Sequence, residues 1–309
     1  MIIRKYKISV IVPSYNSHST IRDCINSLLN QDIDTDYEII VIDSSEDEGI
    51  VEMLRGLPRV KIYHSEKRLN AGQARNLGVK ISKGEILAFI DSDCIAPRDW
   101  LKNILDCVKK YPEICGVLGV YTGGRSLVEK ISGGEYLEES SIGFYGGFIE
   151  GNCAFKREIF EKGCSWSERA RSQYVGLAEC MKSKIKKPVL WNSNLKVLHL
   201  GRVSFNKIIK SGRSKFEEDI KSPKLMLRSL LFSIVFLAGF ASIPLYLAFS
   251  EAKLILLFIF PNSLLTYYVL KDRMLSLRYR VIFLPYLLCL RWLFWFGWIH
   301  AAVNKIFSI

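Results

Sequence analysis

The sequence predicts an α/β domain with a doubly wound, mostly parallel sheet, followed by an all-α membrane domain. Short apolar runs alternate with amphipathic helical patterns from residue 8 to residue 90, and aspartates follow two of those runs. Long uncharged stretches fill residues 229–303. Alternating strand and helix patterns favour parallel pairing, because consecutive parallel strands need a long crossover that is usually helical.

Hydrophobic periodicity places the elements of the first part. The predicted strands are short apolar runs bounded by turn residues, and the last of them, I-L-A-F-I, is expected to be covered on both faces. In the predicted helices, apolar residues recur every three or four positions. The predicted strands are residues 8–12, 39–42, 60–63 and 86–90, and the predicted helices are residues 21–29 and 72–81.

Aspartates lie where two predicted strands end. Asp43 follows the second apolar run, and Asp91 and Asp93 follow the fourth. Ligands of open α/β sheets bind outside the carboxyl ends of the strands. Side chains two residues apart in an extended segment point the same way, so both carboxylates of the later pair can reach one divalent cation, directly or through water. The alternative is a solvated Asp-Ser-Asp turn.

Four stretches, in this order, resemble family 2 glycosyltransferases with the GT-A fold. They are V-I-V-P-S-Y-N-S at residues 10–17, E-I-I-V-I-D-S-S at 38–45, A-G-Q-A-R-N-L-G at 71–78 and A-F-I-D-S-D at 88–93. Several motifs that agree in order and spacing are more specific than any one of them. The resemblance therefore disfavours the simple turn and implies a Rossmann-like GT-A domain.

The resemblance implies a nucleotide-sugar donor and a divalent metal. Such a metal neutralises the charge that builds on the leaving nucleoside diphosphate. A half-buried rim residue for the tyrosine and a surface charge for the arginine remain the structural alternatives. The residues that the resemblance assigns are Pro13, Tyr15 and Asp43 for the nucleoside, Arg75 for the diphosphate, and Asp91 and Asp93 for Mn²⁺ or Mg²⁺.

Two later residues extend the predicted donor site. His199, in V-L-H-L-G-R, matches a late histidine that many relatives carry close to the metal and diphosphate, and Arg202 is a further diphosphate candidate. A purely structural histidine stays open as the alternative. Processive synthases of the family carry Q-x-x-R-W, whereas the Arg-Trp pair at Arg291 lacks the Gln. This difference argues against a polymer synthase.

The sequence does not secure a general base. Residues 150–160 resemble the acceptor-side strand and helix of the family, but Ser172 and Gln173 stand roughly where the family carries a Glu-Asp pair. Neither side chain accepts a proton near neutral pH. Glu168 is the first candidate base and Glu179 the second. A lipid-phosphate acceptor, which is already ionised, would need no base.

Three apolar stretches predict the membrane part. Residues 229–249 contain 21 residues without a charge and residues 254–270 contain 17 more, and about 20 such residues span a bilayer core. Residues 281–303 form either a third crossing or an interfacial helix, because Arg291 at the centre of a crossing would cost about 2.5–3.5 kcal/mol. Basic segments flank these stretches, which predicts a multi-pass protein of the cell membrane with a cytosolic N-terminal domain.

Length and charge agree with this division. The 309 residues carry a formal net charge of +12. The predicted domains are a GT-A domain at residues 1–215, a basic juxtamembrane linker at 216–228 and transmembrane helices at 229–303. Basic residues beside apolar stretches indicate anionic lipid headgroups as partners and argue against nucleic acid. The eight cysteines contain no C-x-x-C and are predicted to be reduced core residues.

The sequence therefore predicts a membrane-anchored, non-processive, inverting glycosyltransferase. It is expected to move one sugar from a nucleotide-sugar donor to a lipid-linked acceptor, either a polyprenyl phosphate or a polyprenyl-linked glycan. Two alternatives stay open: a non-catalytic nucleotide-sugar-binding membrane scaffold, and a membrane nucleotidyl- or phosphotransferase. The sequence leaves the oligomeric state open.

Overall fold

The computed structural model describes residues 6–123, 140–144, 149–168 and 173–201, with residues 209, 216, 299 and 300. The chain divides into two units. The first unit, Met1–Glu135 with Glu139–Arg202, contains the described α/β domain. The second unit is Tyr136–Glu138 with Val203–Ile309, and the only residues of it that the structure describes are the four isolated ones.

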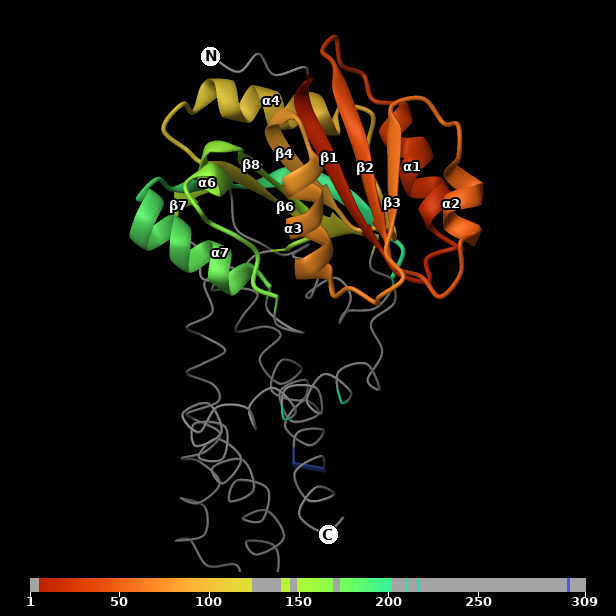
Figure 1. The fold of residues 1–309 in the computed structure, drawn as a ribbon. Coiled ribbons are helices and arrows are strands. Elements are labelled where there is room, and N and C mark those ends of the chain that lie inside the picture. Colours follow the sequence, from red (N-terminus) through yellow and green to blue (C-terminus); the bar gives the residue numbers. More distant parts are fainter. Residues whose placement is uncertain are drawn as a thin grey trace, which may run out of the picture. The chain divides into compact units, whose positions relative to one another are not determined.

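A single mixed sheet of nine strands runs through the described part of the chain (Figure 1). Its order is β3-β2-β1-β4-β8-β6-β9-β5, and β7 pairs with β9 beside this path. The four N-terminal strands are mutually parallel neighbours, and β8 is antiparallel to β4. The strands are β1 (Tyr6–Ser14), β2 (Tyr37–Asp43), β3 (Val60–His64), β4 (Gly84–Ile90), β5 (Cys94–Ile95), β6 (Gly116–Thr122), β7 (Ser141–Gly143), β8 (Asn152–Lys156) and β9 (Val189–His199).

Helices cover both faces of the parallel half of the sheet. The larger core cluster joins α1, α2 and α4 to alternate residues of β1 and β2, among them Val10 and Val41. The opposite face of β2, at Ile40 and Ile42, packs against Ala74 of α3. The helices are α1 (Ile21–Leu29), α2 (Gly49–Leu54), α3 (Ala71–Ile81), α4 (Trp100–Lys110), α6 (Glu158–Glu161), α7 (Tyr174–Cys180) and the π-helix η1 (Met181–Ile185).

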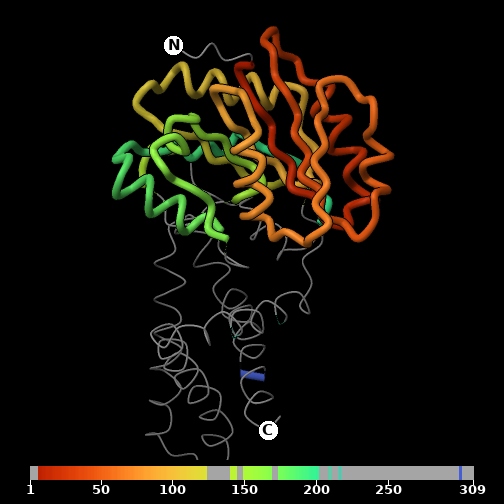
Figure 2. The backbone as a smooth tube through the Cα atoms, in the orientation of Figure 1, coloured from red at the N-terminus to blue at the C-terminus, as the bar shows by residue number. Residues whose placement is uncertain are grey.

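The structure confirms the predicted alternation of strands and helices. The predicted helix 21–29 has the bounds of α1, α3 begins one residue before its prediction, and the four predicted strands lie within β1 to β4. Beyond β4 the sheet is mixed: β5, β7 and β8 run antiparallel to their neighbours, whereas β6 and β9 pair in parallel. Apolar patterns report the burial of a strand but not the direction of its partner. Figure 2 shows the division, with the red and orange strands in one half and the yellow-green and green segments in the other.

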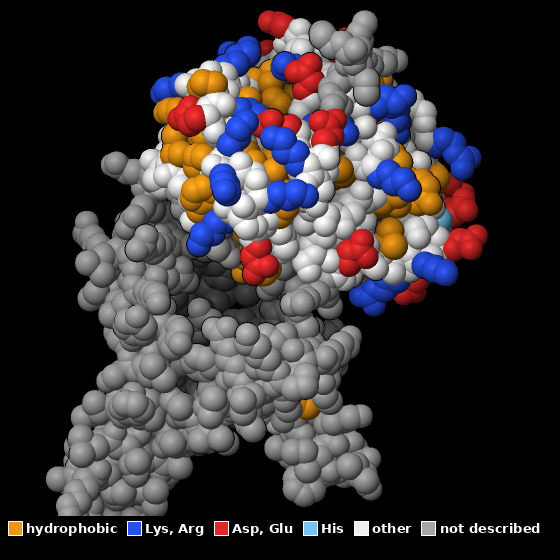
Figure 3. All heavy atoms as spheres, turned by 60° about the vertical axis from the view of Figure 1, so that its left-hand side comes forward, with side chains coloured by type: hydrophobic (Ala, Val, Ile, Leu, Met, Phe, Trp, Pro, Cys, Tyr) orange, Lys and Arg blue, Asp and Glu red, His pale blue; other side chains and the backbone are white. Residues whose placement is uncertain are grey.

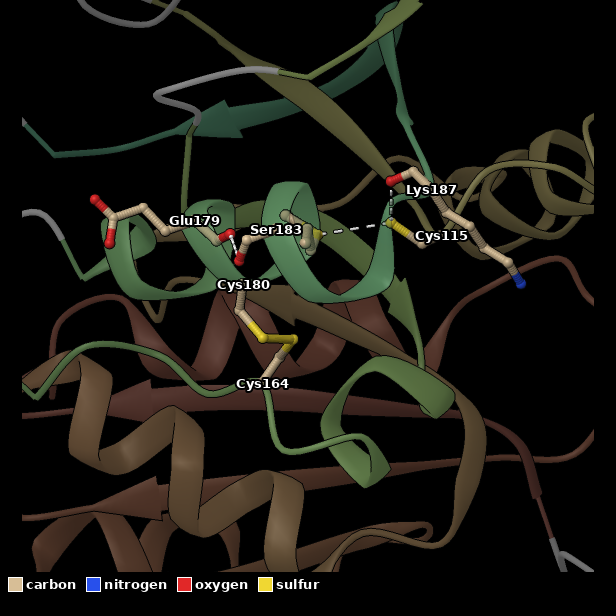
Figure 4. The surroundings of a disulfide bond; sticks show 7 residues. Cys115, Cys164, Glu179, Cys180, Ser183 and Lys187 are labelled. Carbon is tan, nitrogen blue, oxygen red and sulfur yellow. Dashed lines mark hydrogen bonds between the residues drawn. A yellow bond between two sulfur atoms is a disulfide. The ribbon is translucent and has the colours of Figure 1, made fainter.

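The prediction that all cysteines are reduced is wrong for two of them. Cys164 and Cys180 form a disulfide that joins the segment after α6 to the end of α7 (Figure 4). The other described cysteines are free thiols, and four of these five are buried. The two bonded residues are 16 positions apart without a C-x-x-C spacing, so only the tertiary fold brings them together.

The described residues do not test the predicted membrane part. The predicted linker 216–228 and the apolar stretches within 229–303 lie almost wholly outside them. None of the helices in the described ranges is long and apolar enough to cross a membrane. On the face of the domain in Figure 3, Lys and Arg side chains lie among apolar patches and are interspersed with Asp and Glu.

Candidate active site

Polar residues gather where the parallel strands end. Ser14, Asp43 and His64 close β1, β2 and β3, and the strand register pairs Ser14 with Asp43 and Asp43 with His64. Asp91 follows β4, whose last residue pairs with the first residue of β8. The predicted donor residues and the start of β8 therefore meet at one edge of the sheet, as expected for an open α/β fold.

Asp43 is fully buried and is bonded at both carboxylate oxygens. Its Oδ1 accepts hydrogen bonds from Ser14 Oγ at 2.9 Å and Ser45 Oγ at 2.7 Å. His64 Nδ1 lies 2.9 Å from Oδ2. A buried carboxylate needs such partners, because its desolvation is otherwise costly. Asp43 is thus fixed in orientation at the floor of the predicted nucleoside site.

Two further predicted nucleoside residues come from β1 and the turn after it. Pro13 is buried within β1, and Tyr15 is half-buried just beyond the strand. The Tyr15 hydroxyl donates to Glu46 at 3.1 Å, and the guanidinium of Arg68 lies 4.3 Å from the centre of the tyrosine ring. Tyr15 therefore lies beside the residues that follow β2, while its nucleoside role stays a prediction.

Arg75 lies between two carboxylates. It extends from α3, whose N-terminus is closed by a capping box between Asn70 and Gln73. Its Nη2 donates to Asp91 Oδ1 at 2.8 Å and its Nη1 to Glu150 Oε2 at 2.9 Å. The guanidinium, whose side chain is 2% exposed, also lies 5.0 Å from the ring centre of Trp166. Arg75 is thus a buried cation, and the alternative of a surface charge is wrong.

Asp91 is held from a second side by Tyr121, whose hydroxyl donates to Asp91 Oδ2 at 2.7 Å. Burial, and then the charge of Asp91, raise the pKa of Tyr121 well above its ordinary value, so the phenol stays a donor. Burial opposes the charge on Arg75, but Asp91 and Glu150 outweigh it and raise the pKa of the guanidinium. Burial raises the pKa of Glu150, although Arg75 opposes the shift. The four side chains form one hydrogen-bonded network.

Asp93 and His199 come together on the other side of this network. β5 pairs with the end of β9, and His199 Nε2 lies 3.4 Å from Asp93 Oδ2. With Cys94, they form a group whose ligand atoms all lie within 4.8 Å of one another. Gly201 leaves space for this contact, because a Cβ there would lie 2.5 Å from Asp93 Oδ2 and 2.6 Å from the imidazole.

This group suits a divalent metal. A carboxylate and an imidazole are ligands that Mn²⁺ accepts. The Cys94 thiol is less suited, since burial raises its pKa and keeps the sulfur protonated. The sequence predicted Asp91 and Asp93 as the metal pair. The structure places His199 at Asp93, whereas the Asp91 carboxylate is oriented by Arg75 and Tyr121.

The candidate bases lie in different surroundings. Glu168 is exposed near α3, where Asn76 Nδ2 donates to its Oε1 at 3.2 Å. Glu179 is exposed on α7, and Figure 4 shows its carboxylate directed away from the disulfide. Gln173 is buried directly before α7. Ser172 and the predicted diphosphate residue Arg202 lie outside the described residues.

Three side chains of this edge were not predicted from the sequence: His64, Tyr121 and Glu150. Each stands at the end of a strand or directly before one, at the edge where Asp43 and Asp91 also lie. Glu150 opens the E-G-N-C-A-F stretch, whose resemblance to the acceptor-side strand was the available signal. Its contacts with Arg75 and with the Tyr174 amide could not be read from spacing, because 75 and 24 residues separate the partners.

Comparison with solved structures defines the class of protein. The mannosyltransferase PcManGT from Pyrobaculum calidifontis, in complex with GDP-Man and Mn²⁺, has a TM-score of 0.60 at 18% sequence identity and covers 98% of this chain and 88% of that chain. TarS 1-349 from Staphylococcus aureus, in complex with UDP-GlcNAc, has a TM-score of 0.51 at 19% identity, with 97% and 91% coverage. These likenesses show that the chain has the fold of GT-A glycosyltransferases.

The sequence comparison then gives the family. The profile "Glycosyl transferase family 2" matches residues 9–164, and the chain belongs to this family. The poly(ribitol-phosphate) beta-N-acetylglucosaminyltransferase TarP of Staphylococcus aureus is 36% identical over 133 residues, which is 40% of each chain. Glycosyltransferase AglE of Haloferax volcanii is 33% identical over 101 residues, 31% of this chain and 33% of that protein. The matched segments thus span two fifths or less of these relatives' lengths.

Proposed function

We propose that the protein is a metal-dependent glycosyltransferase that transfers one sugar, with inversion, from a nucleotide-sugar donor to a lipid-linked acceptor. The proximity of Asp93 and His199, beside a firmly oriented Asp91, carries the proposal. It supplies a divalent-cation site at the strand ends where an open α/β sheet binds its ligand. The family match and the neighbours that contain GDP-Man with Mn²⁺ or UDP-GlcNAc support it.

The proposed mechanism separates binding of the donor from activation of the acceptor. Mn²⁺ or Mg²⁺, when bound, neutralises charge on the leaving nucleoside diphosphate. Asp93 and His199 would hold this ion, with Asp91 oriented beside them by Arg75 and Tyr121. Asp43 fixes the nucleoside from its buried position at the end of β2. Such preorganised charges need no rearrangement when the transition state forms.

On the acceptor side, Glu168 is the proposed general base. It takes the proton of the acceptor hydroxyl while the oxygen attacks the anomeric carbon opposite the leaving diphosphate, which inverts that carbon. Glu168 lies beside α3, the helix that carries Arg75, and its backbone carbonyl accepts a hydrogen bond from Asn70 at 2.8 Å. An acceptor that is a lipid phosphate dispenses with this step because it is already ionised.

The lipid-linked acceptor and the membrane attachment are the finer part of the proposal. The apolar stretches at 229–249 and 254–270 and their basic flanks support it. We propose a multi-pass protein of the cell membrane with the α/β domain on the cytosolic side. Anionic headgroups would then face the basic juxtamembrane segment.

A thermal-shift screen of the full-length protein tests the donor side. The panel is UDP, GDP and dTDP sugars, each with Mn²⁺ and with EDTA. A ligand that binds the native state raises the unfolding temperature by mass action, so we expect one nucleotide to raise it with Mn²⁺ and to lose that effect with EDTA. The proposal fails if no nucleotide sugar stabilises the protein in the presence of metal.

The reaction product separates the proposal from its alternatives. A glycosyltransferase releases a nucleoside diphosphate from the donor that the screen identifies. Release of a nucleoside monophosphate or pyrophosphate would instead indicate the nucleotidyl- or phosphotransferase. Donor binding without release in the presence of membrane lipid extracts would favour the non-catalytic scaffold.

A further inference from the structure

Glu150 is a half-buried carboxylate for which the proposed mechanism has no use. It lies just before β8, two residues from Asn152, whose register partner Ile90 immediately precedes Asp91. Its side chain is 17% exposed. One oxygen accepts from Arg75 Nη1 at 2.9 Å, and the other accepts from the Tyr174 amide at 3.0 Å, at the start of α7. Glu150 therefore joins the arginine of the donor site to the start of α7.

Arg75 has few other anchors. Its side chain is 2% exposed, and its Nε has no hydrogen-bond partner in the described part of the chain. Its remaining contacts are the Asp91 carboxylate and the Trp166 ring. A buried guanidinium that loses one carboxylate cannot turn to water, so it must satisfy its charge at the other.

We propose that Glu150 is a positioning residue of the metal site, which shares the charge of Arg75 and so leaves the Asp91 carboxylate available to the cation. This role rests on the proposed metal-dependent function and deepens it. Without Glu150, both Nη groups of Arg75 turn to Asp91. Asp91 already accepts one hydrogen bond from Arg75 at Oδ1 and one from Tyr121 at Oδ2. A second bond from Arg75, whose charge Glu150 would no longer share, would neutralise the Asp91 carboxylate further, and its share in cation binding would fall.

The Glu150→Gln variant isolates this role. An amide has one acceptor oxygen and one donor nitrogen. Either Arg75 or the Tyr174 amide therefore faces an N–H group in the variant, and the negative charge is gone. Loss of a residue that orients a metal ligand typically lowers metal affinity by about 10- to 100-fold.

The experiment measures Mn²⁺ alone, from the electron paramagnetic resonance signal of the free ion, titrated with full-length protein. We expect Glu150→Gln to bind Mn²⁺ about 10- to 100-fold more weakly than the wild type. The matched control is Glu158→Gln on α6, which removes a glutamate paired with Lys187 at the surface and should leave the affinity unchanged. Equal affinity of Glu150→Gln and wild type would overturn the proposal.

The double variant Arg75→Gln with Glu150→Gln tests whether Glu150 acts through Arg75. With no guanidinium to neutralise Asp91, the double variant should lose less than about 10-fold in Mn²⁺ affinity relative to the wild type, although Arg75 no longer orients Asp91. It also leaves no buried cation, so it carries the test even where the single variant does not fold. The proposal would be overturned if the double variant lost about 10- to 100-fold in Mn²⁺ affinity, the loss expected for Glu150→Gln.

Failure of the metal site itself gives a different result. A wild-type protein that does not bind Mn²⁺ would overturn the proposed function, and the positioning role with it. If the wild type binds Mn²⁺ and the Glu150→Gln variant binds it equally well, only the positioning role would be overturned.

Discussion

Two regions of this domain differ in how they are held. The donor edge is the end of the sheet where Asp43 and Asp91 lie, and the acceptor segment is the stretch that carries Glu168. Asp43 and Asp91 end parallel strands, and Asp43 is bonded to residues of its own and the two neighbouring strand ends. The segment that carries Glu168 is held by contacts distant in sequence, including Asn76 to the Trp166 carbonyl across 90 residues. The donor edge follows from the sheet, whereas the acceptor segment depends on individual tertiary contacts.

The largest expected effect is at the donor edge. Asp93→Ala removes a proposed metal ligand from a half-buried position without opening the core, so turnover should be abolished while the protein still folds. Stabilisation of the leaving group by a metal contributes several kcal/mol, so we expect at least about a 10³-fold loss. Turnover is measured at saturating donor with Mn²⁺. The matched control is Asp106→Ala on the exposed face of α4, which should remain active. Near-normal turnover of Asp93→Ala would refute the metal assignment.

A smaller effect is expected on the acceptor side. Glu168→Gln should lower the rate of the chemical step by roughly 10² to 10⁴ while donor affinity stays the same. Single-turnover kinetics and donor titration measure the two quantities separately, and Glu113→Gln, at an exposed position between α4 and β6, serves as the control. If Glu168→Gln stays within a few-fold of the wild type, an ionised lipid-phosphate acceptor becomes the better explanation.

Removal of the disulfide tests whether the stability of the acceptor segment affects binding at the donor edge. Replacing Cys164 and Cys180 together by Ser releases a loop of 16 residues, which should lower the free energy of unfolding by about 3 kcal/mol. Urea unfolding of the full-length protein measures this change. Dithiothreitol should lower the free energy of unfolding of the wild type by a similar amount. Donor affinity measures the coupling of the two regions, because the loop contacts the Asp91 network through the Trp166 ring at Arg75 and the Tyr174 amide at Glu150. A large loss of donor affinity would show that the two regions are coupled.

The smallest effect lies in the strand beneath the donor edge. Burial would raise the pKa of Glu38, but hydrogen bonds from Lys61, Ser9 and the Lys83 amide outweigh it and lower the pKa below 4.5. A lowered folded-state pKa gives stability that is present above pH 4.5 and is lost as the pH falls through the folded-state value. Glu38→Gln should therefore cost about 1 to 2 kcal/mol at pH 7.

Unfolding at several pH values checks this prediction. The difference between wild type and Glu38→Gln should shrink as the pH falls below 4.5. Glu85→Gln, at an exposed position of β4 in the same sheet, is the control and should differ little from the wild type throughout. A difference that stays constant with pH would mean that Glu38 contributes by packing and not by charge.

The same contrast explains what could be predicted from the sequence. The parallel strands, α1, α3 and the placement of Asp43 and Asp91 at one edge follow from local periodicity and from a general rule of open sheets. The pairing and direction of the later strands could not be predicted, since β9, for example, pairs with three other strands far from it in the chain. The disulfide could not be predicted for the same reason, because only the folded chain brings its two cysteines together.

The side chains around the aspartates were the hardest part to predict. The sequence motif places Arg75 near the diphosphate, but the structure shows it between Asp91 and Glu150, so its charge is shared inside the protein. Tyr121 and Glu150 lie on strands or loops outside the four matching stretches. Their contribution depends on distances of under 3 Å that only the folded chain defines.

Tyr121 and His199 link the two aspartates through their stacked rings. The rings of Tyr121 and His199 stack with centroids 4.5 Å apart and planes 9° from parallel, while Tyr121 contacts Asp91 and His199 contacts Asp93. A substitution that shrinks either ring leaves the other without its stacking partner and disturbs both aspartates at once. Positions 121 and 199 should therefore vary together among homologues, although 78 residues of chain separate them.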